Sequence, residues 1–123
     1  MSSSFKTLVK LAKKLRSPTG CPWDRSRKIE DMAENIEEEA GEVMEAFKNR
    51  DYKNLREELG DVLFNIVLTS VIAEEMGKFS IDDVIADIDK KIRDRHTWVF
   101  GKDKAKTTEE ALEMWRRNKA ANK

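Results

Sequence analysis

The chain has 123 residues, enough for one domain with a small hydrophobic core, and we expect residues 1–123 to form a single domain. Its 24 Lys and Arg balance 24 Asp and Glu, so the net charge gives no overall attraction to nucleic acid or to a membrane. A single cysteine excludes an internal disulfide framework, and a single histidine excludes a two-histidine metal site within one subunit. Five glycines and two prolines argue against a turn-rich all-β fold.

No targeting or membrane-spanning segment is recognisable in the sequence. The N-terminal residues have lysines within their apolar pattern, unlike the apolar core of a signal peptide. The most apolar run, Val62–Ala73, has 12 residues, whereas about 20 are needed to span a bilayer. We therefore expect a soluble protein of the cytoplasm.

The first three predicted helices follow from apolar residues at helical spacing. The first covers the stripe from Phe5 to Leu15, and residues 17–24, with two prolines and a glycine, interrupt the pattern. A second helix is predicted at about Ile29–Asn49. A third is predicted at Tyr52–Met76, with Gly77 in the usual C-terminal glycine position.

Two capping boxes mark the remaining helices. Ser80 and Asp83 open a fourth helix, and residues 95–106 are polar and predict a loop. Thr107 and Glu110 open a last helix. Because no segment alternates with period two, the fold class is all-α, a bundle of four to five helices.

The third helix is predicted to be apolar on two sides. Its core stripe is Leu55, Leu59, Val62, Leu63, Ile66 and Ser70. The opposite stripe is Phe64, Leu68, Val71 and Ile72. A helix that is apolar all round must be buried all round, and few helices are available to cover it. We expect a second copy of the chain to cover the opposite stripe, giving a dimer or tetramer; a fully enclosed central helix is the alternative.

Acidic residues are concentrated in the middle of the chain. Between Glu30 and Asp61 there are 12 acids and 4 bases, a net charge of −8, so the remainder carries +8. Either the helices have ordinary solvated faces, or an acidic cation-binding centre lies between basic segments that hold an anionic ligand.

Two pairs of carboxylates stand out in this acidic region. Glu39 and Glu42 are three residues apart on one helix, and Glu58 and Asp61 are three apart on the next. At about 100° per residue both pairs fall on the same side of their helix's core stripe, and Asn65 continues that side. If the helices pack antiparallel, the four carboxylates face one another.

Carboxylates brought together repel unless a cation neutralises them. Mg²⁺ and Mn²⁺ prefer oxygen ligands, and Mg²⁺ usually takes further ligands from phosphates. The pattern therefore favours a magnesium site, with Mn²⁺ as a substitute, that acts on a phosphorylated substrate. Ordinary solvated acidic faces remain the alternative.

Four motifs follow one another along the chain, namely Cys21-Pro22-Trp23-Asp24, Glu38-Glu39-x-x-Glu42, Glu57-Glu58-Leu59-Gly60-Asp61 and Arg95-His96-x-x-Val99-Phe100. In this order they resemble the MazG family of nucleoside triphosphate pyrophosphohydrolases. The resemblance implies a helical, oligomeric fold and Mg²⁺-dependent cleavage of a nucleoside triphosphate to the monophosphate and pyrophosphate. It also implies that the metal ligands are Glu39, Glu42, Glu58 and Asp61, with Glu38 as a close acidic neighbour.

The resemblance extends to residues that contact the nucleotide. Lys91 and Arg95 match basic residues that hold phosphates, and their spacing of four puts them on one helical face; each is otherwise a surface charge. Trp115 and Lys119 match residues near the nucleotide, with a core anchor as the alternative for Trp115. Trp23 either stacks on a base or pins its loop to the bundle.

The predicted activity is hydrolysis at the α-phosphorus, with Glu38 or Glu39 accepting the proton of the attacking water. The expected role is removal of surplus or aberrant nucleotides. The chain departs from the family pattern at Arg27, Asp94 and Trp98, so base and sugar preference stay open. The alternative function is a non-catalytic helical oligomer that acts as an interaction module. A nucleic-acid-binding bundle is less favoured, because the acidic region repels phosphate.

Overall fold

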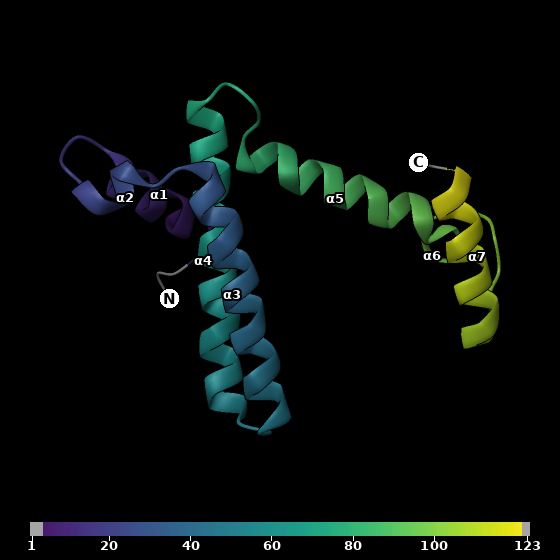
Figure 1. The fold of residues 1–123 in the computed structure, drawn as a ribbon. Coiled ribbons are helices and arrows are strands. Elements are labelled where there is room, and N and C mark those ends of the chain that lie inside the picture. The colour runs from purple at the N-terminus through teal and green to yellow at the C-terminus, as the bar shows by residue number, and fades with distance from the viewer. Residues whose placement is uncertain (1–3, 122–123) are drawn as a thin grey trace. The chain divides into compact units, whose positions relative to one another are not determined.

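The computed structural model describes residues 4–121, which divide into two compact units. The N-terminal unit ends at Ile81 and the C-terminal unit begins at Asp82. The described residues form seven helices and no strand, which confirms the all-α prediction. The helices are α1 Phe5–Arg16, α2 Pro22–Ser26, α3 Ile29–Lys48, α4 Tyr52–Glu75, α5 Ile81–Arg95, α6 Thr97–Phe100 and α7 Thr108–Ala121 (Figure 1). None of these helices is both long and apolar enough to cross a membrane.

The N-terminal unit is built on α4, against which α1 and α3 both pack. α3 and α4 run antiparallel and side by side (Figure 1). Their short connection is possible because Arg50 adopts the left-handed region, with a φ of 54°. Asp51 caps α4 by accepting a hydrogen bond from the Asn54 backbone N–H at 3.1 Å. Gly77, with a φ of 72°, follows the end of α4, as the sequence predicts.

The apolar core of this unit lies between α4 and its two neighbours. Its buried side chains are Ala12 of α1, Met32 and Ala46 of α3, and Val67, Leu68, Val71, Ile72 and Ala73 of α4. Burying each large member contributes roughly 1.5–3 kcal/mol to folding. The core is therefore concentrated in the C-terminal half of α4, where both α1 and α3 are available to pack.

The assignment of the two apolar stripes of α4 was wrong for six residues, whereas Ser70, expected in the core stripe, is buried. Three residues expected to await a partner subunit are only 3–4% exposed within one chain, namely Leu68, Val71 and Ile72. Three residues expected in the core are 37–53% exposed, namely Leu59, Leu63 and Ile66. The physical reason is that α1 and α3 pack on the side of α4 that carries Leu68, Val71 and Ile72. The side that carries Leu59, Leu63 and Ile66 is left exposed.

Two segments expected to be irregular contain short helices. α2 lies partly within the interruption at residues 17–24 and begins with Pro22, a residue suited to the first helical turn. α6 occupies four residues of the expected loop at 95–106. Both are too short for apolar periodicity to reveal them.

The C-terminal unit contains α5 to α7, with α7 packed on α6. The capping box at the start of α7 is confirmed: Thr107 Oγ1 accepts from the Glu110 N–H at 3.1 Å, and Glu110 Oε1 accepts from the Thr107 N–H at 3.2 Å. Asn118 is 7% exposed, and its Nδ2 donates to the Arg95 carbonyl at 3.2 Å and to Thr97 Oγ1 at 2.9 Å. Asn118 thus fastens α7 to the end of α5 and the start of α6.

Candidate metal centre

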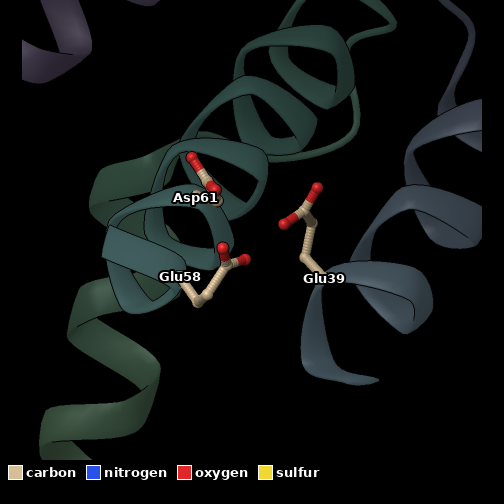
Figure 2. A group of neighbouring side chains, drawn as sticks. All are labelled: Glu39, Glu58 and Asp61. Atoms are coloured by element: carbon tan, nitrogen blue, oxygen red, sulfur yellow. The ribbon is translucent and has the colours of Figure 1, made fainter. Parts of the chain in front are cut away.

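Three carboxylates meet across the α3–α4 interface. Glu39 projects from α3 toward Glu58 and Asp61 of α4 (Figure 2). One carboxylate oxygen of each lies within 4.8 Å of the others. The helical phase of the two pairs predicts this meeting, and the structure confirms it for these three residues. The donor set is all oxygen, which suits a hard divalent cation such as Mg²⁺.

The other two predicted acids, Glu38 and Glu42, lie beside the group of three carboxylates but do not belong to it. Glu42 and Glu38 are exposed on α3. Glu42 nevertheless contributes repulsion to both Glu39 and Glu58, and Glu38 contributes repulsion to Glu39. They therefore add negative potential to the centre from its solvent side.

Repulsion among the carboxylates disfavours their charged forms. Partial burial, followed by repulsion from Asp61 and Glu42, raises the pKa of Glu39 above its usual 4.5, while a hydrogen bond with Glu58 offsets part of the rise. Partial burial, followed by repulsion from Asp61 and Glu39, raises the pKa of Glu58 in the same direction. A bound cation would relieve this repulsion, so the electrostatics of the three carboxylates suit a cation.

Asn65 continues the same side of α4 and is buried, with 9% of its surface exposed. Its Nδ2 donates to the carbonyl oxygen of Asp61 at 2.9 Å. Asn65 therefore supports the turn of α4 that carries Asp61, and its amide nitrogen is engaged within the protein. A role in substrate binding stays a prediction.

Four predicted nucleotide-binding residues belong to the C-terminal unit, and two of them lie over the ring of a third. Arg95 and Lys119 both lie over Trp115, with the guanidinium carbon 5.6 Å and Nζ 5.1 Å from the ring centroid. Arg95 Nε is buried without a hydrogen-bond partner. Lys91 and Arg95 share the lining of a pocket of about 340 Å³. Asp87, Lys90 and Asp94 complete its lining, and Lys90 forms an ion pair with Asp94. Three cations against two carboxylates leave the pocket with a small positive excess, which suits a phosphate.

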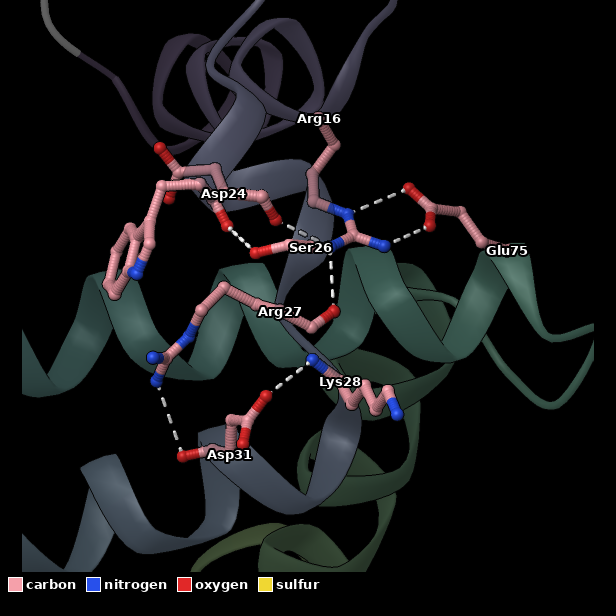
Figure 3. Close-up of polar contacts among 8 residues, drawn as sticks. Arg16, Asp24, Ser26, Arg27, Lys28, Asp31 and Glu75 are labelled. Carbon is pink, nitrogen blue, oxygen red and sulfur yellow. Dashed lines mark hydrogen bonds and ion pairs between the residues drawn. The ribbon is translucent and has the colours of Figure 1, made fainter.

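Trp23 lies in the N-terminal unit and is 60% exposed. The guanidinium carbon of Arg27 is 4.4 Å from its ring centroid. Sequence reasoning noted Arg27 as a departure but gave it no contact, and it missed Arg16, which fastens the same segment (Figure 3). No pattern marks these arginines, because their partners are backbone carbonyls and a residue far along the chain.

Residues 27–100 match the family described as the MazG nucleotide pyrophosphohydrolase domain. The chain belongs to the MazG family. A nucleoside triphosphate pyrophosphohydrolase/pyrophosphatase MazG of Thermotoga maritima is 43% identical over 97 residues, covering 79% of this chain and 38% of that protein. A nucleoside triphosphate pyrophosphohydrolase of Escherichia coli K12 is 38% identical over 109 residues, covering 88% of this chain and 41% of that protein.

The MazG fold is also found in a solved structure. The crystal structure of a mazG-related protein from Thermotoga maritima superposes with a TM-score of 0.78 at 30% identity, over 94% of this chain and 98% of that one. The two curated MazG proteins are longer, and this chain spans about two fifths of each. The similarity of this MazG domain includes α3 and α4, which carry the carboxylate centre.

Proposed function

We propose that this MazG domain hydrolyses a nucleoside triphosphate, ribo- or deoxyribo-, to the monophosphate and pyrophosphate. The observation that carries the proposal is the meeting of Glu39, Glu58 and Asp61 within 4.8 Å in a chain of this family. Relatives that bear the name nucleoside triphosphate pyrophosphohydrolase support the reaction type. Removal of surplus or aberrant nucleotides from the cytoplasmic pool is the proposed role.

The carboxylate centre suits Mg²⁺, with Mn²⁺ as a substitute. Glu39, Glu58 and Asp61 would hold the ion, and Glu42 on the next turn of α3 is the fourth candidate ligand. When bound, the ion polarises the phosphate chain and lowers the pKa of a water molecule. Glu38 or Glu39 accepts the proton of the attacking water, since Glu39 belongs to the carboxylate group and Glu38 is its neighbour on α3.

The substrate's phosphates and base would use different side chains. Lys91 and Arg95 bind the phosphates and offset the charge that develops on the leaving pyrophosphate. Trp115 and Lys119 contact the nucleotide beside Arg95. Trp23 stacks on the base, because its exposed indole offers the surface that nucleobases prefer.

A homo-oligomer, dimer or tetramer, is part of the proposal. Leu59, Leu63 and Ile66 fall within a sector of about 60° on α4 and are all exposed. A second copy would bury this strip. Because the three side chains are already about half buried, their further burial would contribute roughly 1 kcal/mol each. Nucleic acid and membranes are not proposed as partners, because the centre's own acids repel phosphodiesters and lipid headgroups that arrive without a cation.

The test is an assay of the purified protein with Mg²⁺, with Mn²⁺ and with EDTA against normal and damaged NTPs and dNTPs. Chromatography of the products should show a monophosphate and pyrophosphate. Diphosphate and free phosphate would mean that a different bond is cleaved. Absence of both hydrolysis and divalent-cation binding would instead favour the non-catalytic interaction module.

A further inference from the structure

Trp23 stands on a firmly fastened segment although its side chain is 60% exposed. Arg16, whose side chain is only 10% exposed, donates through Nη1 to the carbonyl oxygens of Asp24 at 2.6 Å and Arg27 at 2.8 Å. The same guanidinium bonds Glu75 at the end of α4 through Nε at 3.2 Å and Nη2 at 2.5 Å (Figure 3). Two other elements of the N-terminal unit, α1 through Arg16 and α4 through Glu75, therefore hold α2 in place. A large aromatic surface presented by such a rigid support is typical of a binding site.

Arg27 covers one face of this indole. Its guanidinium carbon lies 4.4 Å from the ring centroid, and Nη2 donates to the Asp31 carbonyl at 3.4 Å. Its Nε is buried without a hydrogen-bond partner. Because Arg27 covers one face while most of the side chain is exposed, the opposite face of Trp23 is open to solvent. The indole of Trp23 thus offers one open face for stacking, and the Arg27 guanidinium lies against its other face.

We infer that Arg27 is a specificity-determining residue that selects purine over pyrimidine nucleotides through Trp23. This inference rests on the proposed function, in which Trp23 stacks on the base. A cation on one face of an aromatic ring draws its π electrons toward that face and makes the other face a better acceptor for an electron-rich partner. Purines are larger and more electron-rich than pyrimidines, and preferences at stacking platforms follow stacking strength.

The reach from the carboxylate centre is suitable for one nucleotide. Asp31, which anchors Arg27, precedes Glu39 by eight residues on α3, a rise of about 12 Å. The two positions differ by less than about a quarter turn around the helix axis. An extended nucleoside triphosphate is long enough to cover this rise along α3. In the proposed binding mode its phosphates lie at the carboxylates and its base at Trp23.

The chain supplies a matched control for the test. Arg50 lies over the ring of Phe47 at 4.3 Å, a similar arginine–aromatic contact at the opposite end of the α3–α4 hairpin. The experiment compares the parent with Arg27→Gln, Arg27→Lys and Arg50→Gln, measuring KM and kcat for GTP, ATP, CTP and UTP with Mg²⁺. A second readout is tryptophan fluorescence during titration with GMP or CMP in EDTA, with Trp23→Phe as the reference that assigns the signal.

We expect Arg27→Gln to lower the purine-over-pyrimidine ratio of kcat/KM by about two- to five-fold, chiefly through KM for the purines. Arg27→Lys should retain part of the ratio because it keeps the charge, and Arg50→Gln should retain all of it. The inference about Arg27 is overturned if Arg27→Gln leaves the ratio of kcat/KM unchanged, or if the parent shows no preference for purines. In either case, hydrolysis of the triphosphates to monophosphate and pyrophosphate still supports the proposed function.

If no triphosphate is hydrolysed, the proposed function is contradicted. The fluorescence titration then tests the role of Arg27 in base selection separately. Purine-selective quenching of Trp23 that weakens in Arg27→Gln then still supports the role of Arg27 in base selection. The role of Arg27 is overturned if GMP and CMP quench the fluorescence equally. It is also overturned if the quenching persists in Trp23→Phe, because the signal then does not come from Trp23.

Discussion

Glu39 of α3 and Glu58 of α4 face each other with carboxylate oxygens within 4.8 Å, and both have raised pKa values. The two residues are 19 positions apart, and the turn at Arg50 brings them together. Their helices pack through the same faces that carry these acids, so the repulsion is built into the fold. The arrangement gives the metal-free protein a stability cost that a cation or a substitution removes.

The first prediction concerns Glu58→Gln. In EDTA this variant should melt at a higher temperature than the parent, because one of the repelling charges is gone. It should gain less stability from Mg²⁺, since it binds the ion more weakly. Pyrophosphate release should fall by at least about tenfold, as expected when a metal ligand is lost. The measurement is thermal melting in EDTA and in Mg²⁺, beside an activity assay.

Glu45→Gln is the control for this comparison, because Glu45 is an exposed acid of α3 outside the carboxylate group. It should leave the response to Mg²⁺ unchanged. If Glu58→Gln melts lower than the parent in EDTA and keeps full activity, Glu58 is a structural carboxylate and the metal site is misassigned there.

The second prediction is a pH dependence without metal. A raised pKa in the folded state means that Glu39 and Glu58 hold protons which the unfolded chain has already released. Their favourable contribution is complete below the usual value of 4.5 and is lost as pH rises through the raised folded values. Chemical denaturation in EDTA should therefore show that the free energy of unfolding of the double variant Glu39→Gln/Glu58→Gln rises relative to that of the parent as pH increases. A difference that stays constant from about pH 4 to pH 8 contradicts this.

Much of the fold and of the carboxylate centre is predictable from helical spacing alone. Phase places Glu39, Glu58 and Asp61 on facing sides, because antiparallel packing follows from the short connection. The core face of α4 was assigned wrongly, because its C-terminal half is apolar on most sides and spacing cannot rank faces of equal hydrophobicity. Only the positions of α1 and α3 decide which apolar side is buried.

The support of Trp23 lies beyond sequence reasoning for a different reason. Arg16 and Glu75 are 59 positions apart, and the other partners of Arg16 are backbone carbonyls, which no residue type marks. Gly20 shows the same limit: a Cβ there would lie 2.2 Å from the Lys14 carbonyl oxygen, and only the folded turn reveals that close approach. Such contacts depend on tertiary structure and leave no periodic pattern.

The third prediction tests the exposed strip on α4. Leu63→Lys should shift the protein toward the monomer mass of 14.3 kDa, because a charge at the centre of the strip opposes its burial. Leu11→Lys is the control, since Leu11 of α1 is likewise exposed, at 51%, but lies outside the strip. Light scattering on a sizing column at micromolar protein is the measurement. A parent that already runs as a monomer with full activity rules out the proposed oligomer.

The fourth prediction concerns the arginine beneath Trp23. Arg16→Met removes the donors of the Asp24 and Arg27 carbonyls and leaves Glu75 without this partner. We expect a loss of about 2–3 kcal/mol in the free energy of unfolding, the usual cost of deleting a charged, mostly buried hydrogen-bond donor. Arg25→Met is the matched control, because the Arg25 side chain contacts the Pro18 carbonyl at 3.5 Å, a longer and weaker bond than those of Arg16 to the carbonyls of Asp24 and Arg27. Equal denaturation midpoints for both variants would show that Arg16 does not fasten α2.

The last prediction concerns acid stability in the C-terminal unit. Thr97 Oγ1 and Arg117 Nη2 donate to Asp103 Oδ2 at 2.6 Å and 2.5 Å, and these bonds lower the pKa of Asp103 below its usual 3.8. A lowered folded pKa stabilises the protein above the unfolded value, and this stabilisation is lost as pH falls through the folded value. Asp103→Asn should therefore reduce stability at neutral pH and flatten the fall in unfolding free energy below about pH 4.

The same substitution should also affect the residues proposed to bind the nucleotide. Thr97 accepts a hydrogen bond from Asn118, which in turn donates to the Arg95 carbonyl. Loosening this chain of bonds should raise KM for triphosphate substrates by weakening the hold of α7 on the end of α5. Glu113→Gln, an exposed acid of α7, is the control and should change neither the acid limb nor KM. The measurement is chemical denaturation from about pH 2 to pH 7 beside steady-state kinetics at neutral pH. An acid limb as steep in Asp103→Asn as in the parent would show that Asp103 gains nothing from Thr97 and Arg117, and that the three residues are ordinary surface groups.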